Sequence, residues 1–283
     1  SLNIIILAAG NGKRMHSALP KVMHKVGGKP MLEHVLISAK KLNPKSINVV
    51  INSKIESIKS SFTDYNIKWH NQIEQKGTAD AVKTVLPNLG VKEKVLILYA
   101  DTPLIDSLLL KTFINYMPES DVKVLTVELN NPYGYGRIIR EQAEEEIISK
   151  IIEETEADEI QKNIKECNTG IVFSDVTNLQ NLISEVKNNN SKKEYYLTDI
   201  VSIANSKGLL VAPLLSKEFN SLLGVNDKCQ LEKTEQIYQN EKRNFFLKQG
   251  VTMLDAKSIF FKGDVEIGKD VEIDFNVMLE GNV

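Results

Sequence analysis

The sequence predicts an α/β protein with a mostly parallel sheet, followed by the start of a repetitive domain. Continuous apolar runs, such as residues 4–7 and 94–100, alternate with segments of helical apolar spacing, such as residues 30–42. Apolar runs without polar alternation are typical of parallel strands that are covered on both faces. Near the C-terminus the period changes to six residues, which is typical of a β-helix. The six-residue pattern comprises Val265, Val271, Val277 and Val283, with Ile267, Ile273 and Leu279 in parallel.

Strand and helix segments alternate along most of the chain, as right-handed crossovers between parallel strands require. In such sheets, ligands bind beyond the carboxyl ends of the strands. The predicted strands are residues 4–7, 47–51, 67–70, 94–100, 122–129, 147–153 and 209–215. The predicted helices are residues 30–42, 55–62, 78–86, 108–116, 198–207 with Thr198 as the cap, and 231–249.

The composition excludes several classes of protein. With 35 Lys and Arg against 37 Asp and Glu, the formal net charge of −2 gives no long-range attraction for nucleic acid or an anionic membrane. No apolar run reaches the ~18 residues of a membrane span, and no signal peptide is found. The two cysteines, Cys167 and Cys229, are typical of a reducing compartment, so we expect a cytoplasmic protein. Cys167 is predicted to be buried rather than nucleophilic, because no basic partner lies nearby in sequence.

A glycine loop follows the first predicted strand. After Leu7, the residues Ala8, Ala9, Gly10 and Gly12 leave almost no side-chain volume. Backbone N–H groups at the carboxyl end of a strand can therefore approach phosphate oxygens closely. We expect this loop to bind a phosphate group.

Two cations, Arg14 and Lys21, follow the loop and would place a planar fork and a point charge beside those oxygens. A dinucleotide fingerprint would need a glycine at Met15 and an acid at Asn52. A P-loop would need Ser or Thr directly after a Gly-Lys pair, where Arg14 stands. The sequence therefore predicts a phosphate site of another kind.

Asp101 is the first candidate metal ligand, because it directly follows the apolar run at 94–100. An acid at the tip of a buried strand can hold Mg²⁺ against a nucleotide, since this hard cation takes few carboxylates and otherwise phosphate oxygens. The alternative for Asp101 is a helix cap.

The motif L-A-A-G-x-G-x-R-M followed by L-P-K, within residues 7–21, resembles the signature of sugar-1-phosphate nucleotidyltransferases. Further motifs resemble the bacterial N-acetylglucosamine-1-phosphate uridyltransferases within that group. They are N-Q-I-E-Q-K-G-T-A-D-A from residue 71, Y-A-D-T-P from 99, G-Y-G-R-I from 134, C-N-T-G-I from 167, E-Y-Y-L-T-D-I from 194 and G-V-N-D from 224. The family usually has Gly at the position of Ala100.

The resemblance implies a role for each motif. Gln72 and the backbone at Gly77 would read uracil, since a side-chain amide carries both a donor and an acceptor. Gly136, Glu153 and Asn168 would contact the sugar. Arg14 and Lys21 would be catalytic, and Asp101 and Asn226 would hold Mg²⁺, with a helix cap as the alternative role of Asn226. The full set of implied substrate-binding residues is Leu7, Ala8, Ala9, Gly10, Lys21, Gln72, Gly77, Thr78, Tyr99, Ala100, Asp101, Gly136, Glu153, Asn168 and Asn226.

The resemblance covers the whole chain and implies a Rossmann-like nucleotidyltransferase fold with the start of a left-handed β-helix. It divides the chain into a uridyltransferase domain at 1–223, a metal-ligand segment with a connecting helix at 224–258, and a truncated β-helix at 259–283. The implied reaction is Mg²⁺-assisted transfer of uridylyl from UTP to N-acetylglucosamine 1-phosphate, by in-line attack on the α-phosphorus. Its product, UDP-N-acetylglucosamine, serves bacterial cell-wall and envelope synthesis.

In the resembled family the β-helix carries an acetyltransferase and most contacts of a homotrimer. We therefore expect this chain to lack acetyl transfer and to be monomeric or weakly associating. Two alternatives to the implied function stay open. One is a nucleotidyltransferase for another sugar 1-phosphate or nucleotide, and the other is a non-catalytic module that binds a sugar nucleotide.

Overall fold

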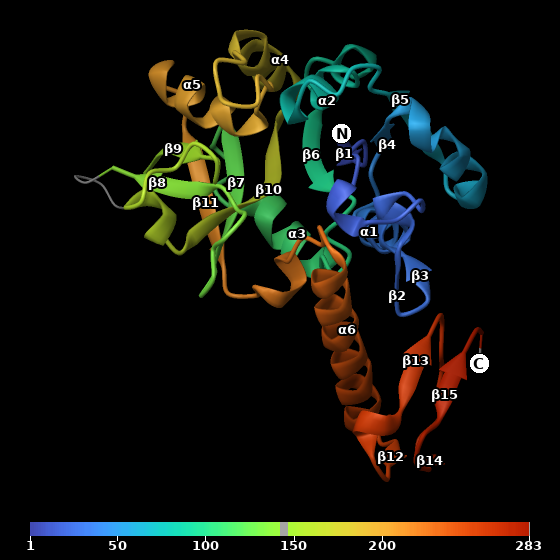
Figure 1. The fold of residues 1–283 in the computed structure, drawn as a ribbon. Coiled ribbons are helices and arrows are strands. Elements are labelled where there is room, and N and C mark those ends of the chain that lie inside the picture. The colour runs from blue at the N-terminus through green and yellow to red at the C-terminus, as the bar shows by residue number, and fades with distance from the viewer. Residues whose placement is uncertain (142–146, 283) are drawn as a thin grey trace.

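The structure is a computed structural model that describes residues 1–141 and 147–282, except for the side chains of residues 53–55. Its centre is a nine-stranded sheet (Figure 1). Seven of its strands have the order β11-β7-β10-β6-β1-β4-β5, and the other two form the β8–β9 hairpin, which pairs with β10. The strands of this sheet are β1 Leu2–Leu7, β4 Ser46–Ile51, β5 Ile67–Asn71, β6 Lys94–Tyr99, β7 Val122–Glu128, β8 Arg137–Arg140, β9 Ile148–Ile152, β10 Glu166–Asp175 and β11 Val211–Ser216. The short strands are β2 Lys25–Val26, β3 Lys29–Pro30, β12 Thr252–Met253, β13 Phe260–Lys262, β14 Glu272–Ile273 and β15 Met278–Glu280.

Most of the sheet is parallel, which confirms the predicted fold class. Strands β6, β1, β4 and β5 pair in parallel, as do β7 and β11, whereas β10 is antiparallel to β6 and β7. The sequence prediction omits β10, whose first half carries Glu166, Asn168, Thr169 and Gly170 in place of an apolar run. Within the described residues, the connection from β7 to β10 contains the β8–β9 hairpin and the 3₁₀ turn η5 (Gln161–Asn163) but no α-helix. Such a return without a crossover helix is possible for antiparallel neighbours.

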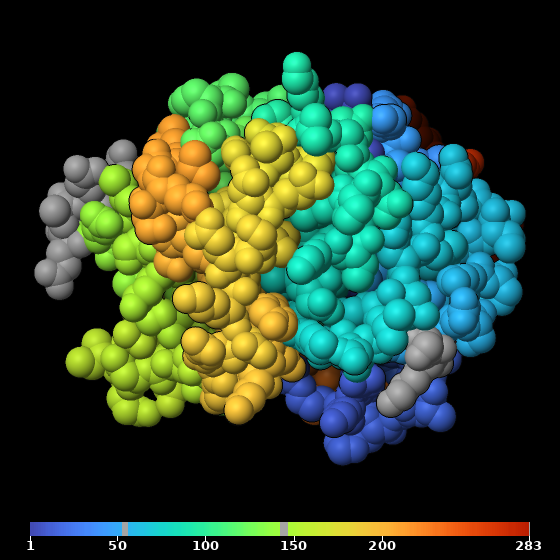
Figure 2. Space-filling model, turned by 90° about the horizontal axis from the view of Figure 1, so that it is seen from above, coloured from blue at the N-terminus to red at the C-terminus, as the bar shows by residue number. Residues whose placement is uncertain are grey.

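Helices cover both faces of the sheet. Ile4 and Ile6 of β1 face the side of α1 and α3, whereas Ile5 and Leu7 face the side of α2, α4 and α5. Figure 2 views this second side, where α2, α4 and α5 lie over the sheet. Because successive side chains of a strand alternate between faces, β1 is buried along almost its whole length. The α-helices are α1 Met31–Lys40, α2 Thr78–Lys83, α3 Ser107–Asn115, α4 Val176–Glu185, α5 Ile200–Ser206 and α6 Lys228–Lys248.

Two helices differ from the prediction, one because it was not predicted and one at its N-terminus. The sequence prediction omits α4, although Asp175 caps it by accepting from the backbone N–H of Asn178 at 2.7 Å. Polar residues between its apolar positions weaken the helical pattern. Helix α6 begins three residues before the predicted start at 231, because Asp227 caps it by accepting from the N–H of Gln230 at 2.8 Å.

Two further predicted helices have another form. Thr198 does not cap α5 but lies inside the 3₁₀ turn η6 (Leu197–Asp199), and its hydroxyl donates to the Glu153 carboxylate at 2.9 Å. Thr198 lies one residue before the N-cap position of α5, which is Asp199, and no side chain caps that helix. The segment predicted as a helix at 55–62 is the 3₁₀ helix η3 (Ser53–Phe62).

The C-terminal residues form one coil of parallel strand pairs, in agreement with the six-residue pattern. β12 pairs with β14, and β13 pairs with β15, which aligns Phe260 with Met278 after three hexads. Ile273 is buried beneath Phe261, whereas Val271 is 40% exposed. A single described coil leaves one side of such a position uncovered, which explains why Val265 and Val277 are only half-buried. Val283 lies outside the described residues.

Helix α6 connects the sheet to this coil (Figure 1), and three contacts fix the arrangement. The N–H of Gly27, between β2 and β3, donates to Glu235 of α6 at 2.7 Å, and the carbonyl of Gly27 accepts from the N–H of Gly263 at 2.8 Å. The carboxamide of Gln239 in α6 bonds to both the N–H and the carbonyl of Phe261. The β2–β3 ribbon, α6 and the coil are therefore joined pairwise.

Within the described part of the chain, no helix is both long and apolar enough to cross a membrane. Cys167 is buried, and burial raises the pKa of its thiol to about 11. This confirms the prediction that Cys167 is buried, and the raised pKa disfavours its thiolate form. Cys229 is exposed.

Arg137 is the largest fully buried side chain near the β8–β9 hairpin. Its guanidinium pairs with Glu154 at 2.7 Å and donates to the carbonyl of Lys162 at 3.2 Å and to that of Tyr135. It thereby ties the segment between β9 and β10 to the start of β8.

We predict that Arg137→Met lowers the free energy of unfolding by about 3–5 kcal/mol, because it leaves two carbonyls without their donor and the Glu154 carboxylate without its cation, with only the N–H of Gly134 still bound to it. Urea denaturation of the purified chain measures this. The control is Lys162→Met, which removes an exposed cation from the same segment and should leave the unfolding curve unchanged. Equal stability of Arg137→Met and wild type would contradict a structural role for this ion pair.

Candidate active site at the carboxyl edge of the sheet

The glycine loop leaves β1 at the carboxyl edge of the sheet and folds back onto Lys21. Gly12 has φ +57°, and a Cβ on it would lie 2.7 Å from the Cβ of Lys21, so only glycine allows this approach. A Cβ on Gly10 would meet nothing within 4 Å. The loop is therefore packed on the Lys21 side and open at Gly10.

Two side chains that the sequence analysis did not assign hold the loop. The carbonyl of Ala9 accepts from the carboxamide of Asn52 at 2.7 Å and from that of Gln75, whose oxygen accepts from Asn11. Since the carbonyl and the following N–H of a planar peptide point in opposite directions, these contacts also orient the N–H of Gly10. The available signal was a polar residue, Asn52, directly after the buried run of β4.

Lys21, Asp101 and Asn226 come together from three separate segments. The Nζ of Lys21 lies 2.5 Å from Oδ2 of Asp101 and 2.8 Å from Oδ1 of Asn226. Asp101 follows β6, and its carbonyl accepts from the N–H of Val225 at 2.8 Å, which brings the Gly224–Asn226 segment beside it. Neither residue has its alternative role, because the caps of α3 and α6 are Asp106 and Asp227.

The oxygens of Asp101 and Asn226 form a donor set that suits a hard divalent cation. Both oxygens face one point, which the ammonium of Lys21 occupies. Among the described residues, no group of three or more His, Cys, Asp or Glu side chains could hold a metal ion. A cation on these two oxygens would thus take its other ligands from water or from a phosphate.

The loop after β5 is held in a fixed shape. The buried Gln72 donates through its NH₂ group to the carbonyl of Gly77 at 3.0 Å and to Asp80 at 2.8 Å, which leaves its carboxamide oxygen as the acceptor. Gly77 has φ +116°, and a Cβ there would lie 2.5 Å from the carbonyl oxygen of Tyr195. Thr78 does not cap α2 but accepts from the N–H of Leu197 at 2.9 Å. The E-Y-Y-L-T-D-I segment therefore supports this loop.

Glu153, Asn168 and Gly136 lie at the neighbouring β8–β9–β10 junction. The N–H of Asn168 donates to the carbonyl of Gly136 at 2.9 Å, and the carboxamide oxygen of Asn168 accepts from the N–H of Gly170 at 3.0 Å. Burial raises the pKa of Glu153, although the hydrogen bond from Thr198 works in the opposite direction. The carboxylate of Glu153 is therefore partly shielded from water.

Tyr99 connects the two halves of the site. Its ring packs against Gly170, where a Cβ would lie 2.5 Å from the ring. Burial, followed by the charges of Glu153 and Asp101, raises the pKa of the Tyr99 hydroxyl, so both carboxylates act on this group. Ala100 is fully buried, and its N–H donates to the carbonyl of Leu7 at 3.0 Å.

Arg14 is the predicted site residue that the structure leaves apart. It lies in the 3₁₀ turn η1 (Lys13–Met15), is exposed, and has no hydrogen bond or ion pair among the described residues. Lys21, Asp101 and Asn226 are within contact of one another, whereas the Arg14 side chain points to solvent.

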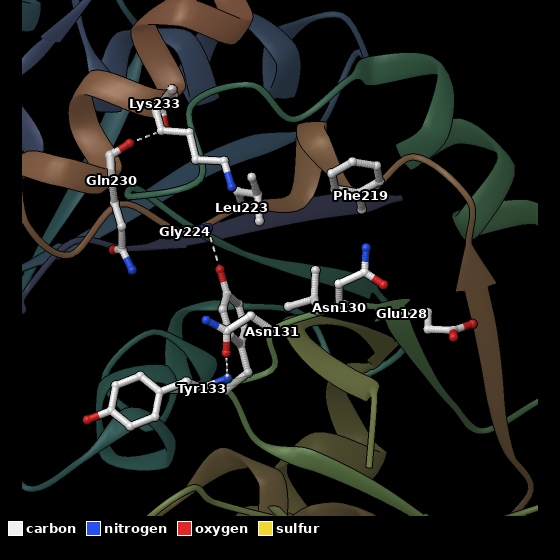
Figure 3. Close-up of a pocket in the computed structure, with 12 residues that line it drawn as sticks. Glu128, Asn130, Asn131, Tyr133, Phe219, Leu223, Gly224, Gln230 and Lys233 are labelled. Atoms are coloured by element: carbon white, nitrogen blue, oxygen red, sulfur yellow. Dashed lines mark hydrogen bonds between the residues drawn. The ribbon is translucent and has the colours of Figure 1, made fainter. Parts of the chain in front are cut away.

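A separate cavity of about 350 Å³ adjoins the Gly224–Asn226 segment (Figure 3). Tyr135 forms one wall, and its hydroxyl accepts from the N–H of Gly224 at 3.2 Å. Lys233 and Gln230 of α6 face it from the other side. None of the predicted site residues lines this cavity, so it is distinct from the site built around Lys21.

The chain is similar to known proteins in sequence and in fold. The profile of the MobA-like NTP transferase domain family matches residues 4–165, which include Lys21 and Asp101. The bifunctional protein GlmU of Neisseria meningitidis serogroup B is 41% identical over 283 residues, which are the whole of this chain and 61% of that protein. The chain thus spans about three fifths of the length of this curated relative.

Two solved structures share the fold. A UDP-glucose pyrophosphorylase complexed with UDP-glucose matches with a TM-score of 0.67 at 18% identity, over 84% of this chain and 98% of that chain. A Bacillus anthracis protein assigned as a glucose-1-phosphate thymidylyltransferase, in complex with sucrose, matches with a TM-score of 0.65 at 18% identity, over 84% of this chain and 95% of that one. At this identity the likeness concerns the fold alone.

We predict that Gly12→Ala destabilises the chain by about 1–3 kcal/mol, because a side chain there is strained at positive φ and meets Lys21. Gly10→Ala is the matched control, since it adds the same methyl group two residues away into open space. Thermal unfolding of both variants measures the difference. Two equal unfolding curves would contradict the tight packing of Gly12 on Lys21.

Proposed function

We propose that this chain, which belongs to the family of MobA-like NTP transferase domains, transfers the uridylyl group of UTP to N-acetylglucosamine 1-phosphate. The products are UDP-N-acetylglucosamine and pyrophosphate. The observation that carries the proposal is the convergence of Lys21, Asp101 and Asn226 beside a glycine loop. This convergence lies at the carboxyl edge of the sheet, where open α/β sheets bind their ligands. The whole-chain likeness to a bifunctional GlmU protein supports the choice of this reaction.

The loop after β5 suits the uracil base. In uracil an N–H donor lies between two carbonyl acceptors, so a reader needs one acceptor flanked by donors. Gln72 offers its carboxamide oxygen, because its NH₂ group is already engaged by Gly77 and Asp80. We propose that this oxygen accepts from the uracil N–H, with Thr78 and the backbone at Gly77 beside it. The N–H groups of Ala9 and Gly10 would lie along the rest of the nucleotide, next to the backbone of Leu7 and Ala8, since the N–H of Ala8 is engaged by the carbonyl of Val50.

Sugar recognition is assigned to the β8–β9–β10 junction. Glu153 is a carboxylate with one oxygen engaged by Thr198, so acceptor capacity remains for sugar hydroxyls. The Asn168 carboxamide keeps its NH₂ donors, and Gly136 lets a ring approach the backbone. Tyr99 would line the floor between base and sugar, with the fully buried Ala100 beneath it.

The chemistry needs positioning and charge neutralisation more than a protein base. A phosphate monoester, with a second pKa of about 6, is largely ionised near neutral pH. One of its oxygens attacks the α-phosphorus, a new P–O bond forms, and the bond from the α-phosphorus to the bridging oxygen of pyrophosphate breaks. Lys21 would bind the α-phosphate, and Arg14 would reach the departing pyrophosphate, for which its exposed position leaves it free to turn.

Asp101 and Asn226 would hold Mg²⁺, which when bound neutralises phosphate charge. Their oxygens fit this cation in chemical type and already face a common point. The amide of Asn226 adds no negative charge. The site with Mg²⁺ bound would therefore keep a net positive charge, which attracts an anionic nucleotide.

We also propose the division of the chain into a transferase unit at 1–223, a connecting segment at 224–258 and a β-helical segment from 259. The separate apolar cores on the two faces of the sheet and around Phe246 support it. Assembly into a trimer through the β-helix is proposed for the longer proteins of this type.

We predict that excess chelator, or Asp101→Asn, lowers the rate of pyrophosphate release at least about 100-fold, because phosphate charge is then not neutralised. A coupled pyrophosphate assay with UTP and N-acetylglucosamine 1-phosphate measures it. Asp106→Asn is the control, since Asp106 only caps α3. Undiminished turnover in chelator would refute the metal assignment.

Glu153→Gln should raise KM for the sugar phosphate about tenfold or more and change KM for UTP less than about twofold, because it weakens hydrogen bonds from sugar hydroxyls to a charged acceptor. The exposed neighbour variant Glu156→Gln serves as the control. Equal effects on both substrates would point to a folding role of Glu153. The same assay with dTTP, CTP and other sugar phosphates separates the alternative transferases, and no turnover with any pair would favour a binding module.

A further inference from the structure

Lys21 occupies the position between the two oxygens that suit a divalent cation. Its Nζ contacts Asp101 at 2.5 Å and Asn226 at 2.8 Å, and the Lys21 and Asp101 side chains are only 11% and 23% exposed. Among the described residues, Asp101 has no other ion-pair partner. Lys21 therefore neutralises the site in the chain without ligands.

We propose that Lys21 is a resident counter-cation that competes with the divalent metal for Asp101 and Asn226. The metal then binds well only together with a nucleotide, whose phosphate offers the ammonium another partner. The nucleotide part of this inference rests on the proposed function. The competition between Lys21 and the metal does not.

Charge and space both require the exchange. A divalent cation and an ammonium that share the same two oxygens repel each other at close range, and in a half-buried site solvent screens this repulsion only in part. The ammonium already lies within hydrogen-bond distance of both oxygens. A metal that contacts the same oxygens must therefore displace it.

The backbone of Lys21 can remain in place while its side chain moves. Lys21 begins the 3₁₀ turn η2 (Lys21–Met23), its carbonyl accepts from the N–H of His24 at 3.2 Å, and its Cβ packs against Gly12. Beyond Cβ the stem is a flexible chain with a mobile point charge. Because the glycine loop adjoins this stem, a phosphate bound there lies within reach of the ammonium.

The exchange predicts positive coupling between metal and nucleotide. A phosphate that draws Lys21 away frees the two oxygens, and a metal that displaces Lys21 frees the ammonium for the phosphate. By linkage, each ligand strengthens the binding of the other by the same factor. Removal of the ammonium should strengthen binding of the metal alone and abolish most of the coupling.

The test measures Mn²⁺ binding to the full chain without nucleotide, by electron paramagnetic resonance of free Mn²⁺. Lys21→Met, which keeps the apolar stem and removes the charge, should bind Mn²⁺ at least about tenfold more tightly than wild type, within the usual range of coupling between sites. Lys13→Met is the matched control, because Lys13 is an exposed cation of the same loop. It should change the Kd less than about twofold.

A second variant and a second condition complete the test. Lys21→Arg keeps a cation and should leave Mn²⁺ binding as weak as in wild type, which also serves if Lys21→Met fails to fold. Addition of UTP without sugar phosphate should tighten Mn²⁺ binding to wild type much more than to Lys21→Met. Unchanged or weaker Mn²⁺ binding by folded Lys21→Met, or tight binding by Lys21→Arg, overturns the proposal. Since no turnover is measured, failure of the uridylyl-transfer assay leaves the Mn²⁺ result interpretable on its own.

Discussion

Three backbone hydrogen bonds extend the parallel ladder one residue beyond the strands, and the positions of the site residues depend on them. The N–H groups of Ala8, Ala100 and Gln72 each donate to a carbonyl on a neighbouring strand, at 2.9, 3.0 and 2.7 Å. The glycine loop, the acid after β6 and the loop after β5 therefore all start at one level of the sheet. A shift of one residue in the register of a strand would turn its side chains to the opposite face of the sheet. The apolar cores on both faces therefore stabilise this register.

Local sequence patterns predicted those parts of the site that a single segment determines. The buried run of β6 placed Asp101 at a strand end. The small residues after β1 predicted that a phosphate approaches the backbone, and this stays a prediction, whereas the structure shows Gly12 packed against Lys21. The same patterns located most strands of the central sheet to within one or two residues, but not β8 or β10. They work because burial on both faces of a sheet leaves few alternatives to a continuous apolar run.

The remaining parts depend on partners that are distant in sequence. The bond from Val225 to Asp101 joins two segments on opposite sides of β10, and nothing near either residue indicates it. Thr198 has the residue type of a helix cap but bonds to Glu153, because a carboxylate lies within its reach in the folded chain. Asn52 stands where a dinucleotide site would need an acid, and the sequence indicates no other role for it. In the structure its partner is the carbonyl of Ala9. Side-chain amides and hydroxyls choose among several partners, so their roles follow from the tertiary structure.

The pairwise contacts of the β2–β3 ribbon, α6 and the coil form a triangle, and a triangle of three struts cannot shear unless one joint breaks. Helix α6 is 21 residues long, which corresponds to roughly 32 Å. The residue before its N-terminal cap is Asn226, and the ribbon begins four residues after Lys21. Lys21 and Asn226, two of the three residues that meet at the ammonium, are thus each close in sequence to an element of this triangle. A displacement of the coil relative to the sheet would therefore act on Asn226 and on the segment after Lys21 at the same time.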